Sequence, residues 1–172
     1  MTGGLTNEDL TALMDHENKY VRSWAIQLLA ENKSMPKEAI DKMAAMALDD
    51  GSKLVRLYIS SALQRINPED RWDVIAGLCS HYEDVNDHNL PLMNWYAFEP
   101  LIDLDVERAM KMAMDAEQPL LLQFSIRKVG SLDSDQAKSV LKETRQKMED
   151  KFTAEQNHEI REELDLLLSD AG

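Results

Sequence analysis

The chain has 172 residues, enough to bury a core, and its charged share of 30% is close to the globular average, which excludes wholesale disorder. Its single cysteine excludes an internal disulfide and any cysteine-based zinc or iron–sulfur site. The net charge of −13 repels phosphate backbones and anionic lipids, so nucleic acid and membrane surfaces are poor candidates for a partner.

Hydrophobic residues recur with helical spacing along almost the whole chain, and no stretch alternates with period two for long enough to predict a strand. The sequence therefore predicts an all-α fold. The expected helices cover about 7–14, 20–31, 36–48, 54–66, 69–82, 90–102, 105–115, 119–131, 134–151 and 154–169. No apolar run approaches the roughly 18–20 residues of a membrane helix, so we expect no membrane insertion.

Two helix starts carry local capping signals. Thr6 followed three residues later by Asp9 predicts a capping box. Asn67 directly before Pro68 predicts an N-cap, since proline fits the first position of a helix. The expected helix at 69–82 begins there.

The chain also repeats itself. The segments 15–22 and 49–56 align without gaps at an offset of 34 residues, and both keep Asp, Lys, Val and Arg at the same positions. A third copy follows 37 residues later, with Leu92 in the valine position and Trp95 in the position of Trp24. A fourth, degenerate copy centres on 119–124. Two helices per repeat of 30–37 residues are typical of a solenoid, in which neighbouring pairs share one core.

The repeated charges predict a hydrogen-bonded ladder between repeats. Asp15 with Arg22, and Asp49 with Arg56, stand seven residues apart in both copies. We expect each arginine to reach a turn carboxylate in its own or in the adjacent repeat. The alternative is that these are ordinary surface charges near a helix start.

The pattern Asp15…Val21-Arg22…Ala25…Leu28-Leu29 resembles the HEAT repeat. A narrower resemblance covers about residues 5–132 and rests on the strings at 20–29, 61–66, 70–72 and 89–101. These strings are similar to the helical segment of large exported planctomycete-type proteins, which are described as membrane-bound dehydrogenases. The resemblance implies a β-propeller and a haem-binding cytochrome c domain elsewhere in such proteins. This chain has no Cys-x-x-Cys-His motif to attach haem, and we expect no cofactor on it.

The resulting prediction is a HEAT-like α-α superhelix (α-solenoid) of about four helix pairs in residues 1–132. Residues 133–172 form a C-terminal pair of capping or docking helices. The favoured function is a non-catalytic module for protein–protein interaction or interdomain scaffolding, with a protein or neighbouring domains as partner. The alternative, implied by the resemblance, is the helical module of an exported dehydrogenase/cytochrome c electron-transfer protein. A stand-alone enzyme is the third possibility.

The beginning of the chain, Met1-Thr2-Gly3-Gly4, shows no signal peptide. The chain as written is therefore expected in the cytoplasm. It is expected in the periplasm if it is part of a larger exported protein.

Candidate chemical groups are few. His81, Asp84, Asp87 and His88 could supply metal ligands, but their spacing and the neighbouring asparagines favour a solvated loop. Cys79 is expected to be a buried structural thiol.

Aromatic residues mark a candidate interaction or packing seam. Trp95, Tyr96 and Glu99 lie just before Pro100, which is expected to end or kink its helix. Trp24 and Trp95 occupy equivalent repeat positions, and we predict both as core residues. The cluster around Trp95 could line a ligand groove or form the central packing seam, and the seam is favoured.

Overall fold

The computed structural model describes residues 4–31, 35–132, 134–151 and 158–169. Within these ranges the regular secondary structure is all helical, with ten α-helices and no strand, so the predicted all-α class is confirmed. The helices are α1 (Asn7–Leu13), α2 (Lys19–Glu31), α3 (Lys37–Asp49), α4 (Lys53–Leu63), α5 (Trp72–Cys79), α6 (Leu90–Leu104), α7 (Val106–Asp115), α8 (Pro119–Gly130), α9 (Asp135–Lys151) and α10 (His158–Ser169). Short 3-10 helices at Pro68–Asp70 and Tyr82–Asp84 flank α5.

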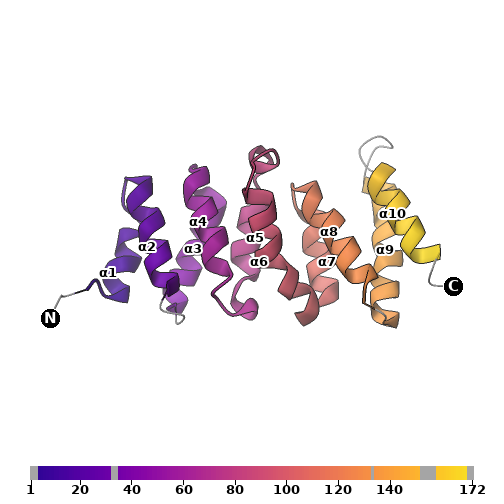
Figure 1. Ribbon diagram of the computed structural model, residues 1–172, viewed down its shortest axis with the longest axis horizontal. Coiled ribbons are helices and arrows are strands. Elements are labelled where there is room, and N and C mark those ends of the chain that lie inside the picture. Colours follow the sequence, from indigo (N-terminus) through magenta and orange to yellow (C-terminus); the bar gives the residue numbers. More distant parts are fainter. Residues whose placement is uncertain (1–3, 32–34, 133, 152–157, 170–172) are drawn as a thin grey trace.

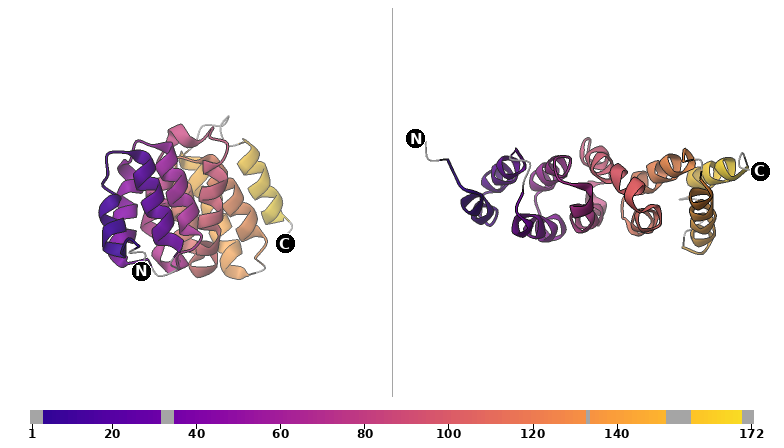
Figure 2. Two further views of the ribbon diagram at one scale, coloured as in Figure 1. Left: turned by 60° about the vertical axis from the view of Figure 1, so that its left-hand side comes forward. Right: turned by 90° about the horizontal axis from the view of Figure 1, so that it is seen from below.

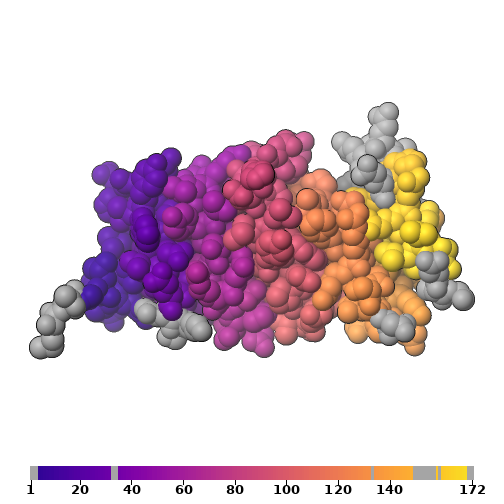
Figure 3. All heavy atoms as spheres, viewed as in Figure 1, coloured from indigo at the N-terminus to yellow at the C-terminus, as the bar shows by residue number. Residues whose placement is uncertain are grey.

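The helices stand side by side in the order of the sequence, which gives an elongated molecule with its termini at opposite ends (Figures 1 and 3). Seen from below, they form two rows (Figure 2). The odd-numbered helices make one row and the even-numbered helices the other. In the even row each helix packs on the next, as α2 does on α4, whereas in the odd row the contacts are between α3 and α5 and between α7 and α9.

The core lies between the two rows because each helix buries one stripe. In α2 the stripe is Ala25, Ile26 and Leu29, and in α4 it includes Val55 and Ile59. These residues follow the helical period of the sequence, so one face of each helix meets its neighbours and the opposite face meets solvent. Neither helix of a pair could bury its stripe alone.

The closest approach in the odd row is between α3 and α5. A Cβ atom on Gly77 would lie 2.9 Å from the Leu48 nitrogen and 3.0 Å from the Ala47 carbonyl carbon. Both are backbone atoms, so the crossing requires a residue without a side chain at position 77.

Helix α6 continues past Pro100 to Leu104, so Pro100 does not end the helix. The guanidinium of Arg71, which is buried, lies near this part of α6. Its Nη1 donates to the carbonyl of Ala97 at 3.1 Å, and its Nε and Nη2 donate to the carbonyl of Ile66 at 2.9 and 2.6 Å. Burial lowers the pKa of Arg71, and no carboxylate of the described residues pairs with it.

The predicted capping box is confirmed at α1, where Thr6 and Asp9 exchange side-chain to backbone hydrogen bonds of 2.9 and 3.1 Å. The helix expected at 69–82 is shorter. Residues 68–70 and 82–84 form 3-10 turns, and the Asn67 side chain caps neither helix. The prediction was wrong there because the polar residues at both ends favour local turns over a continued helix.

The final helices α9 and α10 pack against α7 and α8 at the C-terminal end of the row. Their buried side chains include Val140, Leu141, Met148, Ile160 and Leu164. No helix in the described ranges combines the length and apolar character needed to cross a bilayer.

Candidate functional site

A ladder of hydrogen bonds joins the turns of neighbouring helix pairs. Arg22, in the first turn of α2, donates from Nε and Nη2 to the two carboxylate oxygens of Asp50 at 2.8 and 2.9 Å. Its Nη1 donates to the carbonyls of His16 and Glu17, both at 2.9 Å. The bidentate geometry fixes the first pair of helices against the turn of the second.

Arg56 repeats this arrangement one unit further along. Its Nε and Nη2 donate to the carboxylate of Asp84, and its Nη1 donates to the carbonyl of Asp50 at 2.7 Å. Burial alone would lower the pKa of Arg56. The hydrogen bonds and charge of Asp84, with smaller contributions from Glu83 and Asp50, outweigh that effect and raise the pKa. The guanidinium therefore stays charged in its buried position.

The ladder uses other carboxylates than the sequence analysis named. Asp49 is exposed and the next residue, Asp50, accepts from Arg22. Asp15 is bound by Lys42 at 2.5 Å. In both rungs the arginine bonds to its own turn through backbone carbonyls and reaches forward to a carboxylate 28 residues later. The prediction of Asp15 and Asp49 as partners was wrong, because Asp49 ends α3 and Asp50 is the residue that turns toward α2.

Beyond Asp84 the ladder continues with neutral, buried side chains. Ser60 donates to the side-chain oxygen of Asn94, whose Nδ2 donates to Oε1 of Gln118 at 3.1 Å. Gln118 Nε2 then donates to the carbonyl of Leu78, also at 3.1 Å. The side-chain amides of Asn94 and Gln118 both have hydrogen-bond partners, so this network links α4, α6 and the turn before α8 without an ionic charge.

The outward surface of the even row carries a band of aromatic and apolar side chains. We call this surface the aromatic face, and it consists of Tyr20, Trp24, Leu57, Tyr58, Leu92, Met93, Trp95, Tyr96 and Phe124. The rings of Trp24 and Tyr58 lie 6.5 Å apart, and those of Trp95 and Phe124 lie 5.3 Å apart in an edge-on arrangement. The aromatic side chains of successive even helices thus follow one another across the face.

Trp24 is 56% exposed, so the prediction of a core tryptophan at this position was wrong. Trp95, its repeat equivalent, is half-buried and packs against the core beside Phe124 of α8. The two tryptophans differ in their ring neighbours. Trp95 lies between Phe98 of its own helix and Phe124 of α8, whereas Trp24 has Tyr58 of α4 as its ring neighbour at 6.5 Å.

The predicted seam around Trp95 is divided between core and surface. Phe98 is fully buried, whereas Tyr96 is 52% exposed. Glu99 is half-exposed, with its carboxylate 3.6 Å from the Lys128 ammonium of α8. Phe98 therefore belongs to the core, Trp95 packs on the core at the border of the aromatic face, and Tyr96 is exposed on that face.

Charge is sparse in the middle of the helices that carry the aromatic face. In the segments 20–30, 54–64, 90–98 and 119–126, the charged residues are Arg22 and Arg56, and both are used by the ladder. The other charged residues of α2, α4, α6 and α8 lie toward the helix ends: Lys19, Glu31, Lys53, Glu99, Asp103, Arg127 and Lys128. The middle of the face is therefore apolar, which is typical of an interaction surface.

A groove of about 540 Å³ lies on the aromatic face, over α4. Its floor includes Leu57 and Ser61, Trp24 forms one wall from α2, and Met93 forms the other from α6. The walls and floor are mostly apolar, as in sites that bind bulky side chains.

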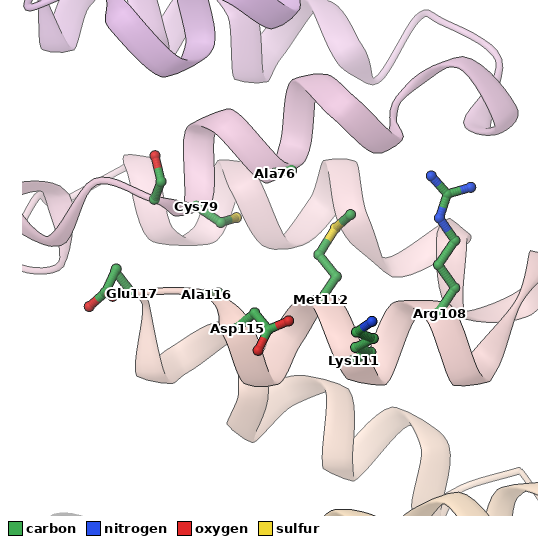
Figure 4. A pocket seen from close by; sticks show the side chains of 9 residues that line it. Ala76, Cys79, Arg108, Lys111, Met112, Asp115, Ala116 and Glu117 are labelled. Carbon is green, nitrogen blue, oxygen red and sulfur yellow. The ribbon is translucent and has the colours of Figure 1, made fainter. Parts of the chain in front are cut away.

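A second pocket, of about 490 Å³, lies between α5 and α7 (Figure 4). Arg108 stands at one end, its guanidinium carbon 4.1 Å from the centre of the Trp72 ring, and Glu117 stands at the other (Figure 4). Cys79 borders the pocket but is buried, and burial raises its pKa to about 12. The expected buried thiol is confirmed, and it is protonated at neutral pH.

The polar loop after α5 is occupied by structural bonds. The Asp84 carboxylate accepts hydrogen bonds from Arg56, and Asp87 Oδ1 accepts from the backbone nitrogens of Asn89 and Leu90 at the start of α6. His81 Nε2 lies 2.8 Å from the Ala47 carbonyl and its Nδ1 lies 2.9 Å from Glu83. Across the described ranges, no group of three or more histidine, cysteine or acidic side chains is arranged to hold a metal ion.

Sequence reasoning missed several of these residues although a signal existed. Asp50 and Asp84 share the 34-residue offset of Arg22 and Arg56. Tyr58 and Phe124 belong to the same aromatic series as Trp24 and Trp95. The scarcity of charge in the middle of α2, α4, α6 and α8 could have been counted directly.

A scan against protein-family models gives no match, and a search of the curated proteins gives none either.

Proposed function

We propose that this chain is a non-catalytic, HEAT-like α-solenoid that binds a protein partner through its aromatic face. The observation that carries the proposal is the band of exposed aromatic and apolar side chains on the even row, whose middle carries no charge besides the two ladder arginines, in a chain with 30% charged residues. Exposed apolar side chains cost free energy in water, so a contiguous band of them favours a partner that covers it.

The ladder supports the HEAT-like part of the proposal. In both rungs Nε and Nη2 of the arginine donate to an aspartate 28 residues later, so successive helix pairs are joined in the same way. A row of equivalent pairs presents an extended surface, which suits a long or flexible partner. The pair α9 and α10 closes the C-terminal end of this row in the proposal, with residues 1–132 as the repeat array.

A display selection tests the proposed function. Peptides are selected on the wild-type chain and then measured on Trp24→Ala/Tyr96→Ala and on Leu48→Ala, a control that removes an exposed leucine of α3 in the odd row. We expect the selected peptides to lose at least about tenfold in affinity on the double variant and to keep it on the control. Peptides that bind all three proteins equally would overturn the proposal.

A second candidate rests on the resemblance at residues 5–132. Its longest string, 89–101, forms most of α6 and brings Trp95 and Tyr96 to the even row. In this candidate the aromatic face contacts neighbouring domains of an exported dehydrogenase/cytochrome c protein. A longer reading frame with a β-propeller and a Cys-x-x-Cys-His motif would support it, and a full-length protein without them would exclude it.

A further inference from the structure

The groove over α4 runs parallel to the helices that form it. Trp24, Gln27 and Glu31 line it at i, i+3 and i+7 along α2, and Asn89 and Met93 line it at i and i+4 along α6. The α2 wall is therefore about 10 Å long, close to two helical turns. This shape matches a helix laid along α4, with its apolar side chains at helical spacing turned into the groove.

One acidic residue, Glu31, is among the residues that line the groove. Its Oε1 accepts from Nε2 of Gln27 at 3.3 Å, and it forms no ion pair with any residue of the described chain. Asp87 lies outside the lining but close to it, since its carboxylate accepts from the backbone nitrogen of the lining residue Asn89. The exposed cation at the end of α4, Arg65, lines a different pocket together with Asp70.

The acidic character extends along the turns that precede the even helices. Lys19 and Lys53 lie at this edge, and Lys53 approaches Asp84 at 3.4 Å. The exposed acidic residues of the same turns are more numerous and include Glu17, Asp49 and Glu117. Asp15 and Glu83 are also exposed there, and they contact Lys42 and Arg56, respectively. A basic partner is attracted by this edge. A second copy of the chain would bring a further charge of −13 against it.

We propose that the groove binds a basic amphipathic helix of a partner protein. A bulky apolar side chain of that helix packs beside Trp24 and on Leu57, and lysine or arginine residues before and after it meet Asp87 and Glu31. This inference rests on the proposed function and adds the chemical class of the partner.

Two synthetic peptides of equal length test the inference by calorimetric titration. One places leucine at helical spacing with lysine elsewhere, and the other replaces every lysine by glutamate. We expect the lysine peptide to bind at least about tenfold more tightly than the glutamate peptide, and high salt to reduce this preference.

Three variants separate the apolar and the charged contributions. Trp24→Ala should weaken lysine-peptide binding by at least about tenfold, because it removes one wall of the groove. Glu31→Lys should weaken the lysine peptide and narrow its advantage over the glutamate peptide. Leu48→Ala, in the odd row, should bind both peptides like the wild type, and circular dichroism should show equal helicity for all four proteins.

Several results would overturn the inference. If both peptides bind equally and Trp24→Ala weakens both, the face binds protein but does not select basic partners, and the proposed function survives. If the lysine peptide binds Trp24→Ala as tightly as the wild type, the attraction is general surface charge. Binding of neither peptide also overturns the inference. The inference is also overturned if the wild type self-associates and Trp24→Ala does not, because a second copy of the chain would then occupy the aromatic face.

Discussion

The guanidinium of Arg56 and the carboxylate of Asp84 are joined by two hydrogen bonds of 2.6 and 2.7 Å, and both side chains are only 1% exposed. The equivalent rung, Arg22 with Asp50, is 17% and 8% exposed. The same bidentate bond therefore exists in two environments within one chain. The buried rung connects the second and third helix pairs at the centre of the ladder.

This difference predicts unequal effects of removing the two arginines. Arg56→Ala removes both hydrogen bonds to the buried carboxylate of Asp84 and leaves Lys53, a half-exposed cation at 3.4 Å, as its ionic partner, so it should lower the free energy of unfolding by about 3–5 kcal/mol. Arg22→Ala also removes the ionic partner of a carboxylate, but Asp50 is more exposed than Asp84. We therefore expect Arg22→Ala to lower the free energy of unfolding by about 1–3 kcal/mol. Urea unfolding of both variants measures the difference. Equal effects, or a larger effect for Arg22→Ala, would contradict the assignment of Arg56 to the buried rung.

The close contact at Gly77 predicts that alanine is not tolerated there. In an open helix Gly→Ala stabilises by up to about 1 kcal/mol. At position 77 the added Cβ meets the backbone of Ala47 and Leu48, so Gly77→Ala should instead destabilise by about 1–3 kcal/mol. Gly51→Ala is the matched control, because nothing lies within 4 Å of a Cβ there. Thermal unfolding should show a large decrease in Tm for Gly77→Ala and only a small change in Tm for Gly51→Ala.

Burial of Cys79 predicts slow thiol chemistry. With its pKa raised to about 12, the thiol carries almost no thiolate at neutral pH, and its side chain is closed to reagents. Iodoacetamide should therefore leave the folded chain unmodified over a period in which it alkylates the urea-unfolded chain completely. Equal rates in the two states, followed by mass spectrometry, would show that Cys79 is accessible.

The helix pattern could be predicted from the sequence, whereas the ladder partners could not. Helical spacing depends on neighbours three and four residues away, so α2 and α7 begin and end within one residue of the expected positions. The choice between Asp49 and Asp50 depends on where α3 ends and on an arginine 28 residues earlier. The exposure of Trp24 depends on which side chains surround it, since Trp95 has two phenylalanine neighbours and Trp24 has Tyr58, and the repeat spacing does not contain this difference.

The cap of α6 predicts a loss of stability in acid. Asp87 accepts hydrogen bonds from the backbone of Asn89 and Leu90, and these bonds lower its pKa. A carboxylate with a lowered pKa in the folded state contributes its full stability above the pKa of the unfolded chain, about 3.9. That contribution is lost as the pH falls below this value and through the folded pKa.

Asp87→Ala should therefore cost about 0.5–2 kcal/mol near neutral pH, and the difference from the wild type should shrink below about pH 4. Urea midpoints of both proteins measured from neutral pH into acid test the dependence. A difference that stays constant throughout that range would show that the Asp87 carboxylate does not cap α6.

The last prediction concerns Trp24 and Phe98, which lie on the even row at opposite extremes of burial. Trp24 is 56% exposed, and Phe98 is fully buried. Trp24→Ala should therefore cost about 1 kcal/mol or less, because the site opens to solvent and leaves no cavity. Phe98→Ala should cost about 3–5 kcal/mol because it forms a cavity.

Acrylamide quenching gives an independent measurement of the exposure of Trp24, since Trp72 is only 7% exposed and Trp95 is half-buried. Trp24→Phe should remove most of the readily quenched emission and leave the urea midpoint nearly unchanged. A large loss of stability in Trp24→Ala, with quenching that Trp24→Phe does not alter, would place Trp24 in the core and remove one wall of the groove.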